Sequence, residues 1–197
     1  MSRKGWIITI SSLIVIALAA SAIYYTFPRN VEVRLTGIKY RLGEEGAKAG
    51  TEQATVFIKG KSRMTWKGKR IFRGEVGIVG EDIPVPEDQR RLTIHFDDKG
   101  MGAMSYAYFD YDRPGGTAHP RTYRYHTLFA NKDYSEITLL LMMPRGGNTD
   151  TSSKWWSGED GFMLSAPANN REEALVVSNQ LMRKYLSQPG LERFRLQ

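Results

Sequence analysis

The chain has 197 residues, no cysteine and a formal net charge of +7 at pH 7. Without cysteine it can form neither a disulfide nor a thiolate metal site, and it cannot use a thiol in catalysis. The basic residues are dispersed and match no nucleic-acid-binding motif, so we expect no nucleic-acid partner.

An uncharged run of 22 residues, WIITISSLIVIALAASAIYYTF, occupies positions 6–27 and lacks Pro and Gly. As a helix it would be about 33 Å long, enough to cross a hydrocarbon core of about 30 Å. Trp6 at one end and Tyr24, Tyr25 and Phe27 at the other suit the two membrane–water interfaces. The predicted division is a cytoplasmic tail over 1–5, a transmembrane helix over 6–27 and one extracytoplasmic domain over 28–197.

A cleaved signal peptide is the alternative interpretation of this run. Ala20, Ser21 and Ala22 form a small-residue cleavage motif behind an apolar segment. The apolar run continues past this motif to Tyr25, which favours a membrane anchor. We therefore predict a single-pass protein of the cell membrane, with membrane lipid as a partner, or a secreted protein if the segment is removed.

After Pro28 the hydrophobic pattern changes to a period of two, which is typical of half-buried strands. Val31, Val33 and Leu35 alternate with polar residues, and a shift at Gly37 predicts a bulge. The strands predicted in this way are 31–40, 54–59, 63–66, 69–79, 91–96, 103–111, 122–129, 137–143 and 161–165. The connections expected to be loops or extended segments are 42–53, 82–89, 112–121 and 144–160.

One amphipathic helix is predicted over 170–187. Asn170 can cap it and Glu173 stands three residues later, as in a capping box, and Pro189 and Gly190 end it. The fold class predicted is therefore α+β: an N-terminal transmembrane helix, then a mainly antiparallel β domain of about eight strands with one C-terminal helix. The sheet would be strongly curved or form a sandwich, and the helix would cover a sheet face or close a barrel mouth.

Aromatic residues supply the candidate binding sites. Tyr106, Tyr108, Tyr123 and Tyr125 occupy alternate positions of two successive strands, so they can form one ladder. A ladder that faces solvent could stack on sugar rings or bind a partner, whereas a buried ladder would only stabilise the sheet.

A second aromatic candidate is the pair Trp155 and Trp156, which lies in a loop of small polar residues. Two adjacent tryptophans in a loop are difficult to bury together. We expect one to pack under the loop, and the other to bind a partner or lipid headgroups.

The candidate polar site is weaker. Asp110 and Asp112 lie two residues apart at a strand end, and His126 is in the following strand, so a carboxylate and histidine site is one hypothesis. No phosphate-binding, dinucleotide-binding, zinc-protease or serine-hydrolase motif is complete. We therefore assign no catalytic residue, metal or cofactor from the sequence.

Two segments, FRGEVGIVGEDIP (72–84) and LSAPANNREEAL (164–175), behind an N-terminal hydrophobic span, resemble small single-pass, membrane-anchored proteins of unknown function in Gram-positive bacteria. The resemblance covers residues 31–187. It implies an extracytoplasmic location and supplies no active-site residue.

The function predicted from these observations is a binding or interaction module at the bacterial cell envelope, whose partner would be an envelope protein, cell-wall glycan or lipid. One alternative is a hydrolase that uses the carboxylate and histidine site. The other is a structural subunit of a membrane complex, in which Ala17, Ala20 and Ser21 pack against another span.

Overall fold

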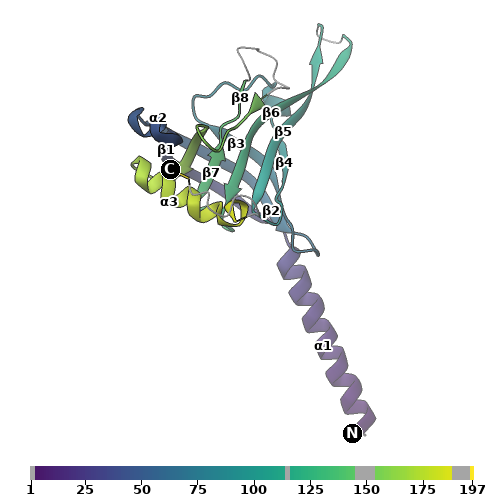
Figure 1. The fold of residues 1–197 in the computed structure, drawn as a ribbon. Helices are drawn as coiled ribbons and strands as arrows, with labels where there is room; N and C mark the ends of the chain where they lie inside the picture. Colours follow the sequence, from purple (N-terminus) through teal and green to yellow (C-terminus); the bar gives the residue numbers. More distant parts are fainter. Residues whose placement is uncertain (1–2, 114–115, 145–153, 188–195) are drawn as a thin grey trace.

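The computed structural model describes residues 3–113, 116–144, 154–187 and 196–197 (Figure 1). A long N-terminal helix is followed by one β-rich domain with short helices near its C-terminal end. The elements are α1 (Arg3–Thr26), β1 (Arg29–Arg41), α2 (Gly43–Lys48), β2 (Glu52–Met64), β3 (Arg70–Ile78), the 3-10 helix η1 (Glu87–Gln89), β4 (Leu92–His95), β5 (Met101–Tyr111), β6 (Ala118–Ala130), β7 (Ile137–Leu140), β8 (Met143–Pro144), β9 (Lys154–Trp155), β10 (Phe162–Ala166), α3 (Arg171–Leu181) and α4 (Arg183–Leu186).

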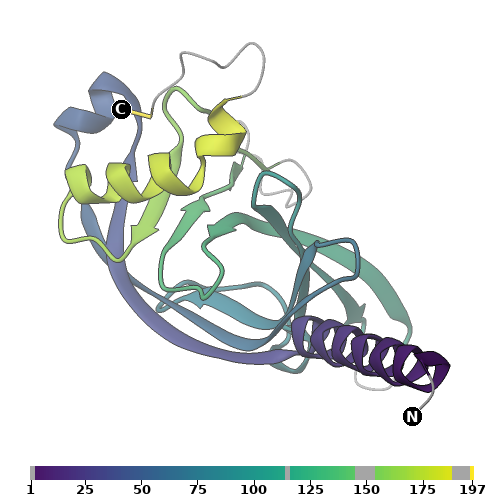
Figure 2. The ribbon, with the colours of Figure 1, turned by 90° about the horizontal axis from the view of Figure 1, so that it is seen from below.

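Eight of the strands form one antiparallel sheet in the order β4-β3-β2-β1-β10-β7-β6-β5. The two edge strands approach each other through a bridge between Phe96 and Gly102. The sheet is therefore nearly closed into a barrel, as Figure 2 shows in a view from below. The prediction of a mainly antiparallel β domain with a C-terminal helix is confirmed, and a curved sheet describes it better than a sandwich.

The interior of this barrel is filled by side chains. Phe72, Ile94, Met104, Leu128 and Leu139 are among the fully buried residues there. Each of them comes from a different strand. Every strand contributes to the interior because its side chains point alternately into and out of the barrel. Burying each large apolar side chain contributes about 1.5–3 kcal/mol, so this cluster is a main source of stability.

Strand β1 changes its buried face along its length. Val31, Val33 and Leu35 pack against the barrel interior, whereas Ile38 and Tyr40 belong to a second cluster on the outer face. The pairing of β1 with β2 is regular throughout, so the bulge predicted at this shift in the pattern is wrong. The shift instead marks the point where the outer face becomes covered by helix.

The glycine at this shift has a packing role. A Cβ added to Gly37 would lie 2.1 Å from the carbonyl oxygen of Ser165 and 2.6 Å from the Cβ of Ala166. Only glycine therefore lets β1 and β10 approach as closely as they do.

The C-terminal helix covers the outer face of β1, β10 and β7, on one side of the ring of strands in Figure 2. Asn170 caps it as predicted, because its side chain accepts a hydrogen bond from the backbone N–H of Glu173 at 2.9 Å. The predicted single helix over 170–187 is instead two helices, α3 and α4, that meet at Met182. Pro189 and Gly190, the predicted end, lie outside the described residues.

A buried hydroxyl network lies between α3 and the sheet. The Ser165 hydroxyl is 2.9 Å from that of Thr138 and 3.0 Å from that of Ser178, and the Tyr40 hydroxyl bonds to Ser178. Burial raises the pKa of Tyr40, so its phenol stays protonated and takes part in this network as a neutral group. The network satisfies polar groups that would otherwise be costly to bury.

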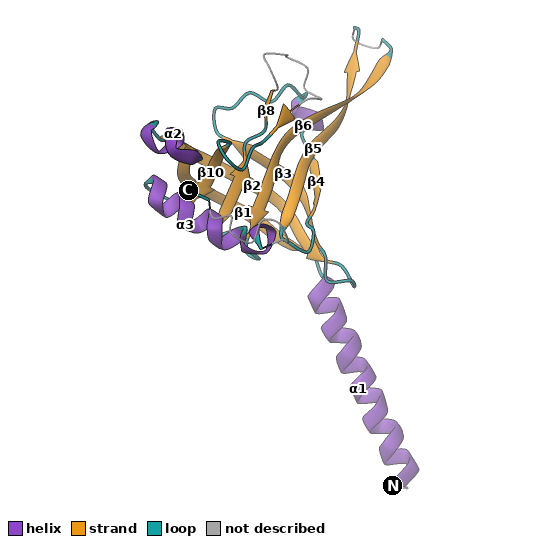
Figure 3. Cartoon of the chain, in the orientation of Figure 1, coloured by secondary structure: helices purple, strands orange, loops and turns teal. Residues whose placement is uncertain are grey.

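Helix α1 projects from the end of the domain at which β1 begins (Figure 3). Within the described part of the chain, no helix meets the length and apolarity needed to cross a membrane. The transmembrane helix predicted over 6–27 includes positions 7–9, whose side chains lie outside the described set.

All four predicted connections differ from the observed ones, since 144–160 contains β9. The segment 42–53 contains α2, and 82–89 contains η1. The predicted loop 112–121 is too long, because β6 already begins at Ala118, opposite Tyr111. Much of the predicted loop 144–160 falls at 145–153, outside the described residues.

Candidate functional site

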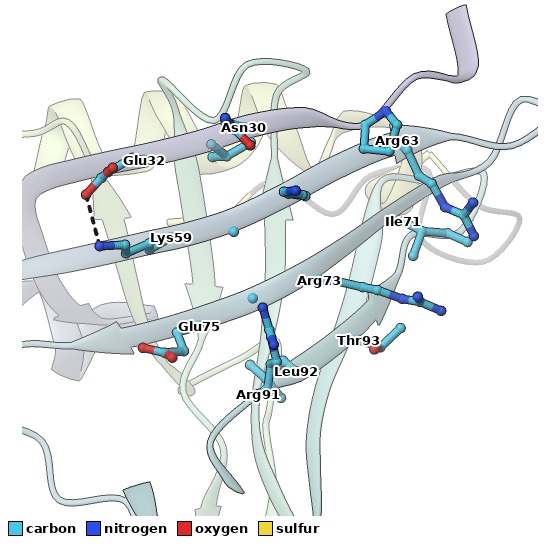
Figure 4. A pocket seen from close by; sticks show the side chains of 15 residues that line it. Asn30, Glu32, Lys59, Arg63, Ile71, Arg73, Glu75, Arg91, Leu92 and Thr93 are labelled. Carbon is cyan, nitrogen blue, oxygen red and sulfur yellow. Dashed lines mark ion pairs between the residues drawn. The ribbon is translucent and has the colours of Figure 1, made fainter. Parts of the chain in front are cut away.

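A cleft of about 810 Å³ runs over the outer face of β1, β2, β3 and β4 (Figure 4). Because neighbouring strands are antiparallel and in register, their outward side chains meet in cross-strand rows. Lys59 lies opposite Glu32 and Glu75, and Lys61 lies opposite Arg73. The positions that form these rows alternate with the inward residues of the barrel core.

The charged side chains of this cleft are mostly cations. They are five basic residues, Lys59, Lys61, Arg63, Arg73 and Arg91, and two acidic residues, Glu32 and Glu75. Lys59 pairs with Glu32 at 3.4 Å, whereas the other four cations have no carboxylate within ion-pair distance among the described residues. Figure 4 shows Arg63 and Arg73 projecting toward the end of the cleft where the chain leads into α1. The cleft therefore has an uncompensated positive charge that an anionic ligand could neutralise.

Two glycines form the floor of the cleft. Gly60 and Gly74 are directly paired, and a Cβ on Gly74 would lie 2.2 Å from the carbonyl oxygen of Lys59. The aromatic ring of Phe72 occupies the inner side of both glycines. Because Cβ atoms at these two positions would point to that inner side, the glycines let the backbones of β2 and β3 approach closely over Phe72, and the floor of the cleft here is strand backbone.

The predicted tyrosine ladder forms, but it faces the barrel interior. Tyr106 pairs with Tyr123 across β5 and β6, and both are buried, as is Tyr125; Tyr108 is half-buried against the same core. Desolvation raises the pKa of Tyr106 to about 12, which fits a phenol held away from water. The ladder therefore stabilises the sheet and does not offer a stacking surface for sugar rings.

His126 has a carboxylate partner that the sequence did not indicate. A bulge in β6 sets Tyr125 and His126 together opposite Met104, and their rings stack with centroids 4.0 Å apart. Glu81 accepts a hydrogen bond from the Tyr125 hydroxyl at 2.8 Å and lies 3.1 Å from Nε2 of His126. Gly80, with φ of 85°, makes the turn after β3 that brings Glu81 to this position.

The electrostatics of this cluster follow from its contacts. Desolvation alone would raise the pKa of Glu81, but the contacts with His126 and Tyr125 and the charge of Lys154 together outweigh it, and the pKa is lowered. Lys154 lies nearby and donates a hydrogen bond to the Tyr123 hydroxyl at 2.7 Å. Glu81 is therefore held as a carboxylate by the side chains of His126 and Tyr125 and by the nearby Lys154.

Both ring nitrogens of His126 are engaged. The backbone N–H of Met142 donates to Nδ1 at 3.2 Å, so Nδ1 is an acceptor and Nε2 is the nitrogen that donates to Glu81. The imidazole is also almost fully buried. A general base needs a free nitrogen within reach of substrate, so this histidine is a structural group.

Asp110 and Asp112 lie far from His126. Asp110 is six residues along β5 from Met104, the residue opposite the bulge, which corresponds to about 20 Å of strand. Asp112 instead lies 3.1 Å from Nε2 of His119, and Asp110 lies 3.9 Å from Arg121. The structure therefore does not assemble the predicted carboxylate and histidine site.

The two tryptophans behave differently, as the sequence led us to expect. Trp156 is half-buried and its indole N–H donates to the carbonyl of Phe162 at 3.1 Å. Trp155 is 48% exposed, and it pairs with the exposed Met143 in the small sheet of β8 and β9. The Trp155 side chain is therefore accessible to a binding partner or to lipid headgroups.

The cations of the cleft are the residues that sequence reasoning missed. Lys59, Lys61 and Arg63 occur at alternate positions of β2, where two strands, 54–59 and 63–66, are predicted with Lys61 between them. Arg73 lies in β3, which pairs with β2. This spacing puts them on one face. The net charge of the whole chain does not show this clustering, because it does not record which face of the sheet each basic residue lies on.

Comparison with known proteins finds no matching family model, no similar curated protein and no similar solved structure.

Proposed function

We propose that this chain is a non-catalytic binding module of the cell envelope, held at a membrane by α1, that binds an anionic polymer in the cleft of β1–β4. The observation that carries the proposal is a set of four cations in the cleft that have no carboxylate partner in the described part of the chain: Lys61, Arg63, Arg73 and Arg91.

The membrane part of the proposal is supported by the uncharged run 6–27 and by the exposure of α1. Along this helix Leu13, Val15, Ile16 and Leu18 are all more than half exposed. A row of large apolar side chains in water is unfavourable, and lipid would remove it from water.

An extended polymer suits the cleft better than a single small anion. The four cations are exposed and come from three strands or their flanks, so each one alone would bind an anion weakly in water. Neighbouring outward positions along a strand are about 7 Å apart. A chain with repeated negative charges can contact several of them at once, and the contacts then reinforce each other.

The test is binding of fluorescently labelled inorganic polyphosphate to the full-length protein in mild detergent, measured by anisotropy at low salt. The variant Lys61→Glu, Arg73→Glu removes two attractions and adds two repulsions. At about 0.5–1 kcal/mol for the change at each site, we expect affinity to fall about 5- to 30-fold.

A matched control carries the same change in charge elsewhere. Lys48→Glu, Lys184→Glu alters two exposed lysines of α2 and α4, away from the cleft. We expect its affinity to remain within about twofold of the parent, because screening weakens distant charges. Equal losses in the two variants would show that binding depends on net charge alone, and would refute the cleft as the site.

A further inference from the structure

A second aromatic and basic feature lies at the turn between β2 and β3. Trp66 is 81% exposed, the largest exposed fraction among the large hydrophobic side chains described. Lys67 and Lys69 follow it, and both are exposed. The tight turn holds these residues outward: the N–H of Gly68 donates to the carbonyl of Thr65 at 2.9 Å.

This turn lies at the end of the domain from which α1 leaves. Ser62 pairs with Arg29, the first residue of β1, and Trp66 follows Ser62 by four residues. At about 3.3 Å per residue, the turn extends about 10–13 Å past the start of β1, toward the last turn of α1. Contacts between α1 and β2 agree with this placement.

The aromatic residues at the end of α1 lie in the same zone. Tyr24, Tyr25 and Phe27 are all exposed, and the guanidinium of Arg29 lies 5.4 Å from the centre of the Tyr24 ring. Aromatic side chains collect at the boundary between lipid and water, and lysines beside them bind anionic headgroups. The helix end and the turn thus carry the same kinds of group side by side.

We propose that the β2–β3 turn is a second membrane contact, in which Trp66 enters the interface of an anionic phospholipid bilayer and Lys67 and Lys69 meet its headgroups. The inference rests on the proposed attachment of α1 to the same bilayer. With two contacts, the tilt of the domain is fixed, because tilting it away on the side of the turn would withdraw the turn from the lipid. The cleft of β1–β4 then has a defined direction relative to the membrane surface.

The test uses the absence of cysteine from the chain. A nitroxide label is attached to Lys67→Cys in the full-length protein, which is reconstituted in vesicles of phosphatidylglycerol and phosphatidylcholine. Electron paramagnetic resonance then compares collisions of the label with oxygen, which enters lipid, and with a water-soluble nickel chelate. A label at Glu44→Cys, on the exposed surface of α2, is the control.

We expect the label at position 67 to collide with the nickel chelate several-fold less often than the label at position 44. Adding Trp66→Ala should remove most of this shielding. Vesicles of phosphatidylcholine alone should weaken it as well, since each lysine near an anionic surface favours contact by about fivefold.

Two results would overturn the inference in different ways. Equal exposure of both labels, in protein that floats with the vesicles, would refute the turn contact and leave the attachment by α1 intact. Protein that does not float with the vesicles would refute the attachment and the turn contact together. Polyphosphate binding by Trp66→Ala tests the cleft separately, and we expect it to be unchanged.

Discussion

The cluster around Glu81 makes a quantitative prediction about stability. The substitution Glu81→Leu removes the acceptor of two buried donors, the hydroxyl of Tyr125 and Nε2 of His126. A buried donor without an acceptor costs about 1–3 kcal/mol, so two donors would cost about 2–6 kcal/mol. Glu81 is about one-third exposed, and water can partly replace it. We therefore expect a loss of about 2–3 kcal/mol in the free energy of unfolding, or about 4–12 °C in Tm.

Urea denaturation of the full-length protein in mild detergent, followed by circular dichroism, measures this loss. Glu81→Gln retains one acceptor and should cost about half as much. Glu75→Leu, at an exposed carboxylate on the outer face of β3, is the control and should change stability by no more than about 0.5 kcal/mol. If Glu81→Leu is no more destabilising than this control, the assigned role of the cluster is wrong.

The same cluster predicts the sign of a pH dependence. The pKa of Glu81 is lowered in the folded protein, so its ionised form stabilises the fold at pH values above the unfolded pKa of about 4.3. That contribution is lost as pH falls through the lower folded pKa. The difference between parent and Glu81→Leu should thus stay constant between about pH 6 and 8 and shrink in acid. A difference that grows on acidification would contradict the sign.

Three further substitutions test the packing, each by urea denaturation. Gly74→Ala places a Cβ 2.2 Å from a carbonyl oxygen of β2 and should lower the free energy of unfolding by about 1–3 kcal/mol or more. The control Gly50→Ala has open space around it and should stay within about 0.5 kcal/mol of the parent. Equal effects of the two substitutions would contradict the close approach of β2 and β3. Tyr40→Phe breaks the hydroxyl network under α3 and should cost about 1–2 kcal/mol; an unchanged stability would mean that the network contributes nothing net. Trp156→Ala should lower the free energy of unfolding by about 2 kcal/mol, clearly more than Trp155→Ala, because only Trp156 packs against the core. A larger loss for Trp155→Ala would mean that Trp155 is the tryptophan that packs against the core.

The strands were largely predictable because their hydrophobic residues alternate with polar ones. The same alternation does not say which face is covered, and this is why the shift at Gly37 was interpreted as a bulge. The tyrosines of β5 and β6 show the same limit: their shared face was predictable, but its inward direction depends on closure of the sheet. Helix α2 was missed because its residues, GEEGAK, are polar and contain two glycines.

The polar contacts were much less predictable than the strands. His126 meets Glu81, 45 residues earlier, and the contact needs both a bulge in β6 and a turn at Gly80. Neither feature has a strong local pattern. The cations of the cleft lie at alternate positions of β2, but the division of this segment into two predicted strands, 54–59 and 63–66, hides their shared face.

The direct passage from α1 into β1 has a mechanical consequence. Only two residues separate the helix from the strand, so a pull on α1 is transmitted along the axis of β1. That strand pairs with β2 from Arg29 to Lys39 and with β10 near its far end, and its hydrogen bonds run perpendicular to the pull. Under such a load the bonds are sheared together instead of being peeled apart one by one. The domain would therefore resist a tension applied through α1.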